Sequence, residues 1–214
     1  MLRSLCCLLV GLTLAGCGST RFAAQVTQFH ELPAYGGGRS FMVAPADPAK
    51  GESLEFASYA GRIVAELQAR GYRQAARLDE SELLALVDYG VGSGTVESYS
   101  IPVYGYYPDE FRRVHGVTSE GERFSAHVYD SGGFVPLGYT ERVRTLYQRR
   151  LSLDIVDAAA WRQDRTVKVY EGRVVSMGPE NDIAAVMPLM IRALFVEFPG
   201  APGATRTIVL DPGP

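Results

Sequence analysis

The chain has 214 residues, 47% of them apolar, and a formal net charge of −3. This composition is typical of a globular protein of about one domain, and it excludes a disordered, strongly charged chain. The nearly balanced charge also argues against a nucleic-acid binder, which usually carries a strongly basic surface, so no nucleic-acid partner is expected.

The N-terminus predicts an export signal. Arg3 supplies a positive charge, and the uncharged apolar run Leu5–Leu14 follows it. Ten helical residues span about 15 Å, half of the roughly 30 Å hydrocarbon layer, so this run is too short to cross a membrane. A basic start, a short apolar run and small residues after it are typical of a cleaved signal peptide, here residues 1–16.

The end of this signal, Leu14-Ala15-Gly16-Cys17, resembles a bacterial lipobox. The resemblance implies cleavage between Gly16 and Cys17, a diacylglyceryl group on the thiol of Cys17, and an acyl chain such as palmitate on the new amino group. The expected membrane partner is therefore the bilayer, held through the acyl chains on Cys17. Gly18 stands where an aspartate would imply retention at the inner membrane. We expect a periplasm-facing lipoprotein of the outer membrane, with the periplasmic face of the inner membrane as the alternative.

The cysteine count restricts the chemistry of the mature chain. Cys6 and Cys7 lie in the segment to be removed, so only Cys17 remains. An intramolecular disulfide and a thiolate metal site both need more cysteines, and we expect no metal and no cofactor. Removal of Arg3 takes the net charge from −3 to −4. Residues 17–25 form a short tether, and residues 26–214 form a single domain.

The first half of that domain predicts two strands and a helix. Short apolar runs at Val26–Leu32 and Ser40–Ala44 are typical of strands. Over Glu52–Arg70 the apolar residues recur every three or four positions, which predicts an amphipathic helix. Its apolar stripe holds Phe56, Tyr59, Ile63 and Leu67. Gly71 stands where a left-handed residue would end the helix.

The second half predicts four strands and a second helix. The strands are Leu84–Val91, Arg142–Val156, Val167–Val175 and Thr207–Leu210, and the helix is Asp182–Val196. In the second strand one parity is apolar and the other is polar, which indicates an antiparallel sheet covered on one side. The apolar parity holds Val143, Tyr147, Leu151, Leu153 and Ile155. Pro188 predicts a kink, or a start of the helix near residue 187. Residues 199–214 are rich in Pro and Gly.

This order of elements predicts an α+β fold, a largely antiparallel curved sheet with two amphipathic helices on one face. Four blocks, "ASYAGRIVAELQARGYRQ", "LLALVDYGVGSG", "LSLDIVDAAAWRQDRTVKVYEGRV" and "LMIRALFVEFPG", resemble the successive blocks of domain of unknown function 4136. That family consists largely of bacterial lipoproteins with two helices on a curved sheet. The resemblance supports the fold and the anchor and implies no activity. Residues 92–140 depart from the family pattern by their length.

Residues 92–140 are rich in aromatic residues and glycine, and hold six of the twelve tyrosines. Structureless loops of this length are uncommon in compact domains, and disordered tracts are poor in aromatics. We expect a long hairpin insertion with arms near Val96–Tyr106 and Arg123–Phe134 and a mobile tip around 117–122. Aromatic side chains are enriched at interfaces, so a candidate partner-binding surface is formed by Tyr104, Tyr106, Tyr107, Phe111, Tyr129 and Phe134. The alternative is that these residues pack against the rest of the domain.

No catalytic motif is recognised in the sequence. His30-Glu31 opens like a zincin motif, but Ala34 stands where the second histidine is needed. We therefore expect no enzyme, but a binding or scaffolding module of the cell envelope. The alternative is an envelope hydrolase with a site built from Asp109, Glu110, His115 and His127.

The strand Arg142–Val156 also carries four arginines close in sequence. They are Arg142, Arg144, Arg149 and Arg150. A solvated sheet face explains such a cluster, and the alternative is binding of lipid head groups or lipopolysaccharide phosphate. Envelope proteins and lipids are the expected classes of partner.

Overall fold

The computed structural model describes residues 21–33 and 36–211. The predicted signal peptide, the cleavage site at Gly16 and Cys17, and the start of the tether lie outside the described residues. The described chain divides into two compact units, which we treat separately. The body comprises residues 21–92 and 148–211, and the ribbon comprises residues 93–147.

The sheet of the body runs in the order β10-β1-β9-β8-β4-β2-β3. The strands are β1 (Phe22–His30), β2 (Ser40–Pro45), β3 (Arg73–Gln74), β4 (Leu83–Val91), β8 (Gly133–Asp157, of which 149–157 pair with β4), β9 (Lys168–Gly178) and β10 (Thr205–Leu210). β1 pairs antiparallel with β9 and β10, and β4 pairs antiparallel with β8, whereas β2 lies parallel to both β3 and β4. The α+β class is therefore confirmed, but the sheet is mixed and "largely antiparallel" is only partly right. Parallel neighbours require a crossover connection, and the first helix of the body supplies it.

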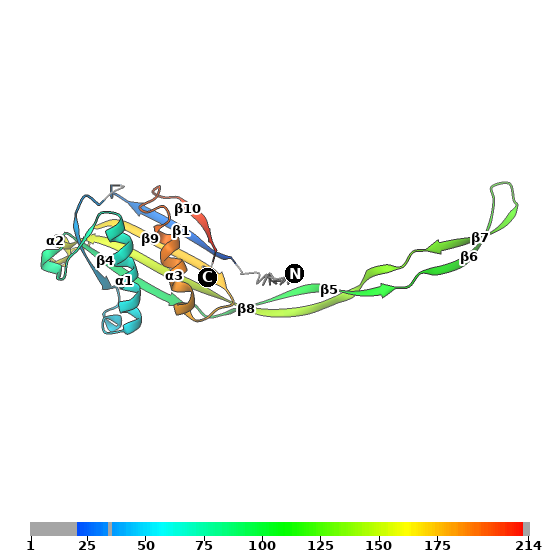
Figure 1. Ribbon diagram of the computed structural model, residues 1–214, viewed down its shortest axis with the longest axis horizontal. Coiled ribbons are helices and arrows are strands. Elements are labelled where there is room, and N and C mark those ends of the chain that lie inside the picture. The colour runs from blue at the N-terminus through cyan, green and yellow to red at the C-terminus, as the bar shows by residue number, and fades with distance from the viewer. Residues whose placement is uncertain (1–20, 34–35, 212–214) are drawn as a thin grey trace, which may run out of the picture. The chain divides into compact units, whose positions relative to one another are not determined.

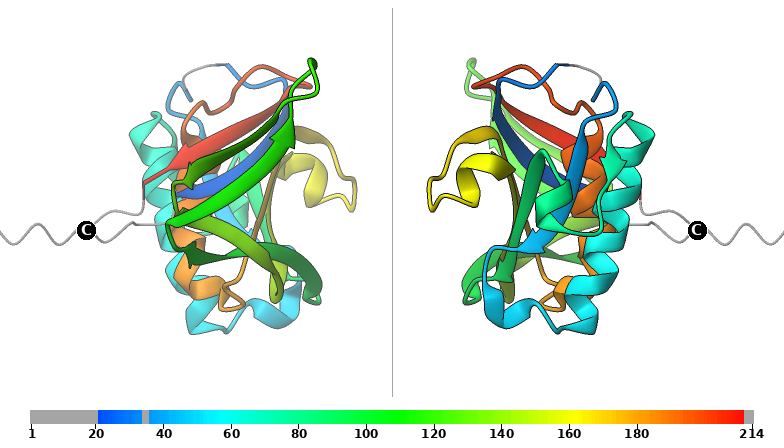
Figure 2. Two further views of the ribbon diagram at one scale, coloured as in Figure 1. Left: turned by 90° about the vertical axis from the view of Figure 1, so that its right-hand side faces the viewer. Right: turned by 90° about the vertical axis from the view of Figure 1, so that its left-hand side faces the viewer.

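The two long helices, α1 (Leu54–Ala69) and α3 (Ile183–Phe195), lie on the same face of this sheet, as predicted (Figures 1 and 2). Ser53 caps α1 by accepting a hydrogen bond from the backbone N–H of Phe56 at 3.4 Å. Gly71 follows the helix with φ +84°, the left-handed conformation that favours glycine. Asp182 caps α3 by accepting from the N–H of Ala184 at 2.9 Å.

The core lies between these helices and the sheet. Leu151, Leu153 and Ile155 of β8 are buried there, as their parity predicts. They meet the apolar stripes of the two helices, formed by Phe56, Tyr59, Ile63 and Leu67 on α1 and by Met187, Met190, Ile191 and Leu194 on α3. Val143, predicted to share the buried face, is instead exposed, because this part of β8 belongs to the ribbon and not to the body.

α3 begins at Ile183, so the alternative start near residue 187 is wrong. Pro188 is the sixth residue of the helix and lies inside it. A proline there removes one hydrogen bond from the first turns. Burial of most of this helix, including both methionines, offsets that loss.

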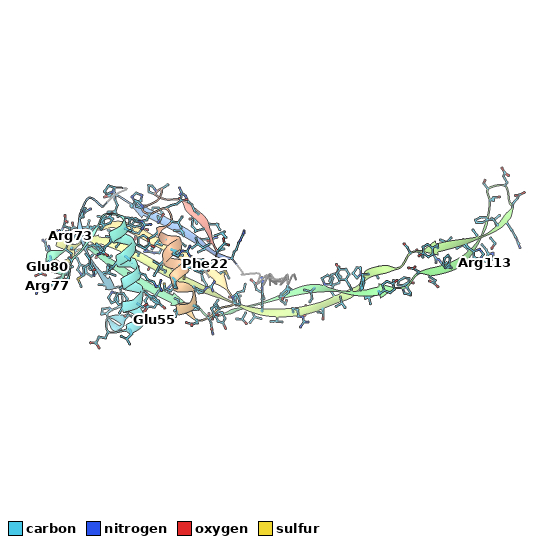
Figure 3. The ribbon with its side chains drawn as sticks, viewed as in Figure 1. Phe22, Glu55, Arg73, Arg77, Glu80 and Arg113 are labelled. Carbon is cyan, nitrogen blue, oxygen red and sulfur yellow. The ribbon has the colours of Figure 1, made fainter. Side chains whose placement is uncertain are left out.

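Short helical elements complete the body. α2 (Ala158–Trp161) lies in the connection between β8 and β9, and 3₁₀ turns occur at Pro48–Lys50 and Leu78–Glu80. Figure 3 shows Arg73, Arg77 and Glu80 at one end of the body, in the segment that leads into β4.

The ribbon is one long antiparallel hairpin with two paired segments, which we call the first and second hairpins, and the second is nested inside the first in the sequence (Figure 1). In the first, β5 (Thr95–Tyr107) pairs with residues 133–146 of β8; in the second, β6 (Glu110–Val117) pairs with β7 (Arg123–Asp130). The expected long hairpin is therefore confirmed, but the predicted pairing of Val96–Tyr106 with Arg123–Phe134 is wrong, because Val96–Tyr106 pairs with residues 134–145 of β8. The turn at 118–122 lies within the predicted tip, where Gly121 has φ +88°. The alternation of apolar and polar residues predicts strands, but it does not predict which residues of two strands are paired. No feature of the sequence indicated that the pairing is interrupted between the two hairpins.

Candidate functional site

Both faces of the first hairpin carry exposed apolar side chains, six on one face and five on the other, and the faces differ mainly in their charge. Directly opposed residues of an antiparallel pair lie on the same face, so the register assigns every side chain. One face, which we call the aromatic face, holds Val96, Ser98, Ser100, Pro102, Tyr104 and Tyr106 from β5 and Phe134, Pro136, Tyr139, Glu141, Val143 and Thr145 from β8. Glu141 is the one charged residue among these twelve.

The aromatic face is open to solvent. Tyr104 and Tyr106 are 59% and 62% exposed, and Phe134 and Tyr139 are each 75% exposed. The rings of Tyr106 and Phe134 meet edge to face, with centroids 5.8 Å apart. Monomeric proteins rarely leave contiguous apolar patches of several hundred Å² uncovered, and such patches mark interaction sites.

A β-bulge decides which residues of β8 join the aromatic face. Val103 pairs with Gly138 and Tyr104 pairs with Pro136, so Leu137 is the extra residue. Beyond the bulge the parity of β8 is reversed, which places Phe134 and Pro136 on the same face as Tyr104 and Tyr106. Leu137 lies on the other face, where its Cδ1 would be 2.2 Å from a Cβ added at Gly105.

The opposite face, which we call the mixed face, combines apolar and charged side chains. It holds Tyr99, Ile101, Val103 and Tyr107 together with Glu97, Arg142 and Arg144. Arg144 Nη2 donates to Glu97 Oε2 at 3.0 Å, and its guanidinium lies 5.4 Å from the centre of the Tyr99 ring. This exposed pair orders the mixed face and contributes little to stability.

The four arginines of β8 do not form the predicted cluster. Arg149 has the parity of the buried residues and is only 4% exposed. Its Nη2 donates to Ser176 Oγ at 2.8 Å, its Nε has no partner among the described residues, and burial lowers its pKa. Arg150 lies 3.8 Å from Asp88 in the body, whereas Arg142 and Arg144 lie in the ribbon. Of the four arginines, only Arg142 and Arg144 lie together on one face, the mixed face of the first hairpin.

The second hairpin carries the remaining aromatics of the predicted surface. Phe111 and Tyr129 are opposed in the register, with ring centroids 4.7 Å apart. The hydroxyl of Tyr129 donates to Asp109 Oδ2 at 2.6 Å, and the N–H of Gly132 donates to Asp109 Oδ1 at 2.8 Å. These hydrogen bonds lower the pKa of Asp109, and the first raises the pKa of Tyr129. They tie Asp109, where the second hairpin begins, to the residues that end it.

The predicted surface is therefore divided among three places. Tyr104, Tyr106 and Phe134 lie together on the aromatic face. Tyr107 lies on the mixed face, and Phe111 and Tyr129 form their own pair in the second hairpin.

The histidines of the second hairpin lie on the same face as Phe111 and Tyr129. His127 pairs with Arg113, whose position on the ribbon is marked in Figure 3, and His115 pairs with Ser125. Arg113 Nε approaches His127 Nε2 at 3.2 Å. Both imidazoles are exposed, and Glu110 lies opposite Asp130 on the other face. Among residues 21–33 and 36–211 no three His, Cys, Asp or Glu side chains gather as a metal site would require.

Charged side chains on the open face of the body are paired with one another. Lys50 Nζ donates to Asp88 Oδ1 at 3.0 Å, and Lys168 Nζ lies 3.0 Å from Asp154 Oδ2. Burial alone would raise the pKa of Asp88, but the hydrogen bond and charge of Lys50, with the charge of Arg150, lower it below its usual range. These contacts form two separate clusters, in which Lys50 and Arg150 face Asp88 and Lys168 and Arg173 face Asp154 and Glu171.

A hollow of about 270 Å³ on the body is lined by Phe29, His30, Lys168 and Glu171, among others. Lys168 is paired with Glu171, and the ring nitrogens of His30 lie 3.1 Å from the carbonyl oxygen of Leu32 and 2.8 Å from that of Gly200, of which a neutral imidazole donates to one. Lys168, Glu171 and His30 are therefore engaged in contacts within the body. In the described part of the chain, no helix is both long and apolar enough to cross a bilayer.

Sequence reasoning missed nine of the twelve residues of the aromatic face. The missed apolar members are Val96, Pro102, Pro136, Tyr139 and Val143. Alternation along 96–106 could have found the residues of β5. The members on β8 depend on the register and on the bulge, which no pattern in the sequence marks.

Comparison with solved structures finds distant likenesses. The chain is similar to a PDZ domain protein from Parabacteroides distasonis, with 10% identity and a TM-score of 0.41 over 89% of this chain, and it spans 40% of the length of that protein. It is also similar to the PelC dodecamer from Paraburkholderia phytofirmans in two crystal forms, with 14% identity in each. The TM-scores are 0.34 and 0.36, over 78% and 80% of this chain and 91% and 94% of the other. Among curated proteins no relative is found.

A family model matches most of the chain. It is described as "Domain of unknown function (DUF4136)" and matches residues 25–200, which include the body blocks on which the resemblance rests. Because this match covers most of the chain, the protein belongs to the DUF4136 family.

Proposed function

We propose that this protein is a lipid-anchored envelope protein that acts without catalysis, as a binding or scaffolding module whose docking surface is the aromatic face of the ribbon. The observation that carries the proposal is that four aromatic side chains lie exposed on one almost uncharged face of a two-stranded hairpin. The body contributes a complete core of its own.

Physical chemistry supports a partner for this face. A two-stranded hairpin alone is marginal in water, and stability usually requires a third strand or a packed layer. Within the ribbon, Tyr106 and Phe134 touch each other but remain mostly exposed. Covering an apolar side chain of this size contributes about 1.5–3 kcal/mol when burial is complete. Binding of a partner to the aromatic face would therefore bury these side chains, and this burial would stabilise both the complex and the fold of the ribbon.

The anchor in this proposal rests on the lipobox-like sequence that ends at Cys17. Each buried CH₂ of an acyl chain contributes about 0.8 kcal/mol, and two or more chains hold a protein stably at a bilayer. We propose the periplasmic face of the outer membrane as the location. The tether from Cys17 to β1 is only a few residues long, so the anchored body would be held close to the lipid surface.

Site-specific photo-crosslinking tests the docking surface. A benzophenone amino acid replaces Tyr106 or Tyr139 on the aromatic face of the full chain in living cells, and Tyr99 on the mixed face serves as the matched control. The proposal predicts discrete adducts from the first two positions and at least several-fold weaker adducts from the control. Equal labelling from both faces, or no adduct from either, would sink it.

The anchor has its own test. Cys17→Ala should abolish incorporation of labelled palmitate and release the protein from the membrane fraction. Cys6→Ala with Cys7→Ala is the matched control and should change neither readout, because both residues lie in the segment to be removed. A Cys17→Ala protein that still takes up label and stays with the membranes would contradict lipidation at this residue.

A further inference from the structure

We propose that the occupant of the aromatic face is the aromatic face of a second copy of this chain, so that two ribbons pack face to face. This inference deepens the proposed function and rests on it. It follows from the charge distribution, the apolar area and the incompleteness of the ribbon.

The charge distribution makes the aromatic face compatible with itself. Glu141 is the single charge among its twelve residues, so two copies can meet without a field of like charges. A face that inserts among lipid head groups would be expected to carry Lys or Arg beside its aromatics. Here both arginines of this hairpin, Arg142 and Arg144, lie on the mixed face. The mixed face places these charges beside five exposed apolar side chains, whereas the aromatic face has six such side chains and one charge, which favours the aromatic face for a second apolar layer.

The apolar area of the face reaches the lower limit for a specific pair. Aromatic side chains can bury 150–250 Å² each, so the four aromatics at their observed exposures, with Val96 and Val143, present roughly 600 Å². Two such faces together bury about 1,200 Å², the lower end of the range for specific protein interfaces. This area places the interaction among the weaker specific pairs, unless anchoring concentrates the copies in one plane.

Packing of two ribbons supplies what each one lacks. Stacked sheets lie about 10 Å apart with interdigitated side chains, and Tyr and Phe are long enough to fill that layer. A two-fold arrangement is self-complementary, since residue i contacts residue j and j contacts i. Face-to-face packing leaves the bulge residue Leu137 and the Glu97–Arg144 pair on the outside of both ribbons.

Cysteine scanning with a bifunctional thiol reagent tests the identity of the occupant. Two differently tagged copies of the full chain are produced in one cell, each with the same substitution. Ser98→Cys, Ser100→Cys and Thr145→Cys probe the aromatic face, and Thr95→Cys and Thr140→Cys are small, polar, matched controls on the mixed face. The chain without an added cysteine gives the background from its own cysteines.

The inference predicts adducts of twice the chain mass that carry both tags, at least fivefold stronger from the aromatic face than from the controls. Tyr106→Ser with Phe134→Ser should lower the yield several-fold at each of the three positions, whereas Tyr99→Ser should not. Equal yields from both faces, or no adduct carrying both tags, overturn the second copy as occupant. If the photo-crosslinks from Tyr106 then lead to a different protein or to lipid, the docking surface stands and only its occupant is wrong. If they too are absent, the proposed function fails as well.

Discussion

Tyr106 and Phe134 face each other across β5 and β8, with ring centroids 5.8 Å apart and planes inclined by 69°, yet both rings remain mostly exposed. Such edge-to-face pairs contribute about 0.5–1.5 kcal/mol beyond the burial of area. The two rings meet because the bulge at Leu137 reverses the alternation of β8, so that the side chain of Phe134 lies on the same face as that of Tyr106. One extra residue thus determines the composition of the aromatic face.

Gly105→Ala should disrupt the bulge. A methyl group there would lie 2.2 Å from Leu137 Cδ1, so Leu137 must move or the register must shift. We expect faster amide hydrogen exchange across β5 and the paired part of β8, and a several-fold loss of crosslinking from Tyr106. Gly138→Ala is the matched control, because nothing lies within 4 Å of a Cβ at that position.

Adding Leu137→Ala to Gly105→Ala should restore exchange protection towards that of Leu137→Ala alone, because the shortened side chain leaves room for the new methyl. The two substitutions are then non-additive, as expected for residues in contact. If Gly138→Ala is as disruptive as Gly105→Ala, or if the double variant is no better than Gly105→Ala, the bulge does not control this face.

Ser176→Ala should destabilise the body. Ser176 Oγ accepts from Arg149 Nη2 at 2.8 Å and donates to the carbonyl of Ala23 at 3.0 Å. Removing the hydroxyl leaves a buried guanidinium short of an acceptor, at a cost of about 1–3 kcal/mol. Urea unfolding followed by the fluorescence of Trp161, the only tryptophan, measures the loss.

Ser152→Ala is the control for that experiment. Its hydroxyl makes a long contact of 3.5 Å with the carbonyl of Asp88, so the expected change is within about 0.5 kcal/mol. An equal loss from both variants would show that the Arg149–Ser176 contact has no special weight.

Asp88 should make the stability of the body depend on pH. Its pKa is lowered in the folded state, so its contribution is fully present above the unfolded value of about 3.9 and is lost as the pH falls through the lower folded value. Asp88→Asn should therefore flatten the dependence of the unfolding free energy on pH below about 5. Lys50→Met removes the hydrogen-bond donor and its charge and should flatten this dependence in part, and the double variant should match Asp88→Asn. Parallel wild-type and Asp88→Asn curves between pH 3 and 6 would refute this coupling.

Most of the body could be predicted from the sequence because its periodicity is driven by one buried face. The stripe on α1 and the parity of Leu151, Leu153 and Ile155 both follow from packing against the same core. The parallel pairing of β2 was missed, since strand direction depends on the crossover through α1 and not on composition. The start of α3 was uncertain because the cost of Pro188 depends on tertiary burial, which local sequence does not show.

The ribbon was predicted less completely. Its aromatic and glycine content indicated a long hairpin, but no core fixes the phase of its strands, so the register and the division into two hairpins could not be derived. The arginines show the same limit. Arg149 lies on the buried parity of β8 despite its charge, and only the structure reveals the contact with Ser176 that holds it there.

Hydroxyl-radical footprinting of the tyrosines in intact cells tests the central claim most directly. On a free ribbon, exposure predicts more oxidation at Tyr139 and Tyr106, 75% and 62% exposed, than at Tyr107 and Tyr99, 52% and 45% exposed. Docking through the aromatic face predicts the reverse order, with Tyr106 and Tyr139 modified several-fold less than Tyr99 and Tyr107. Oxidation that follows the order of the free ribbon would contradict a docked aromatic face.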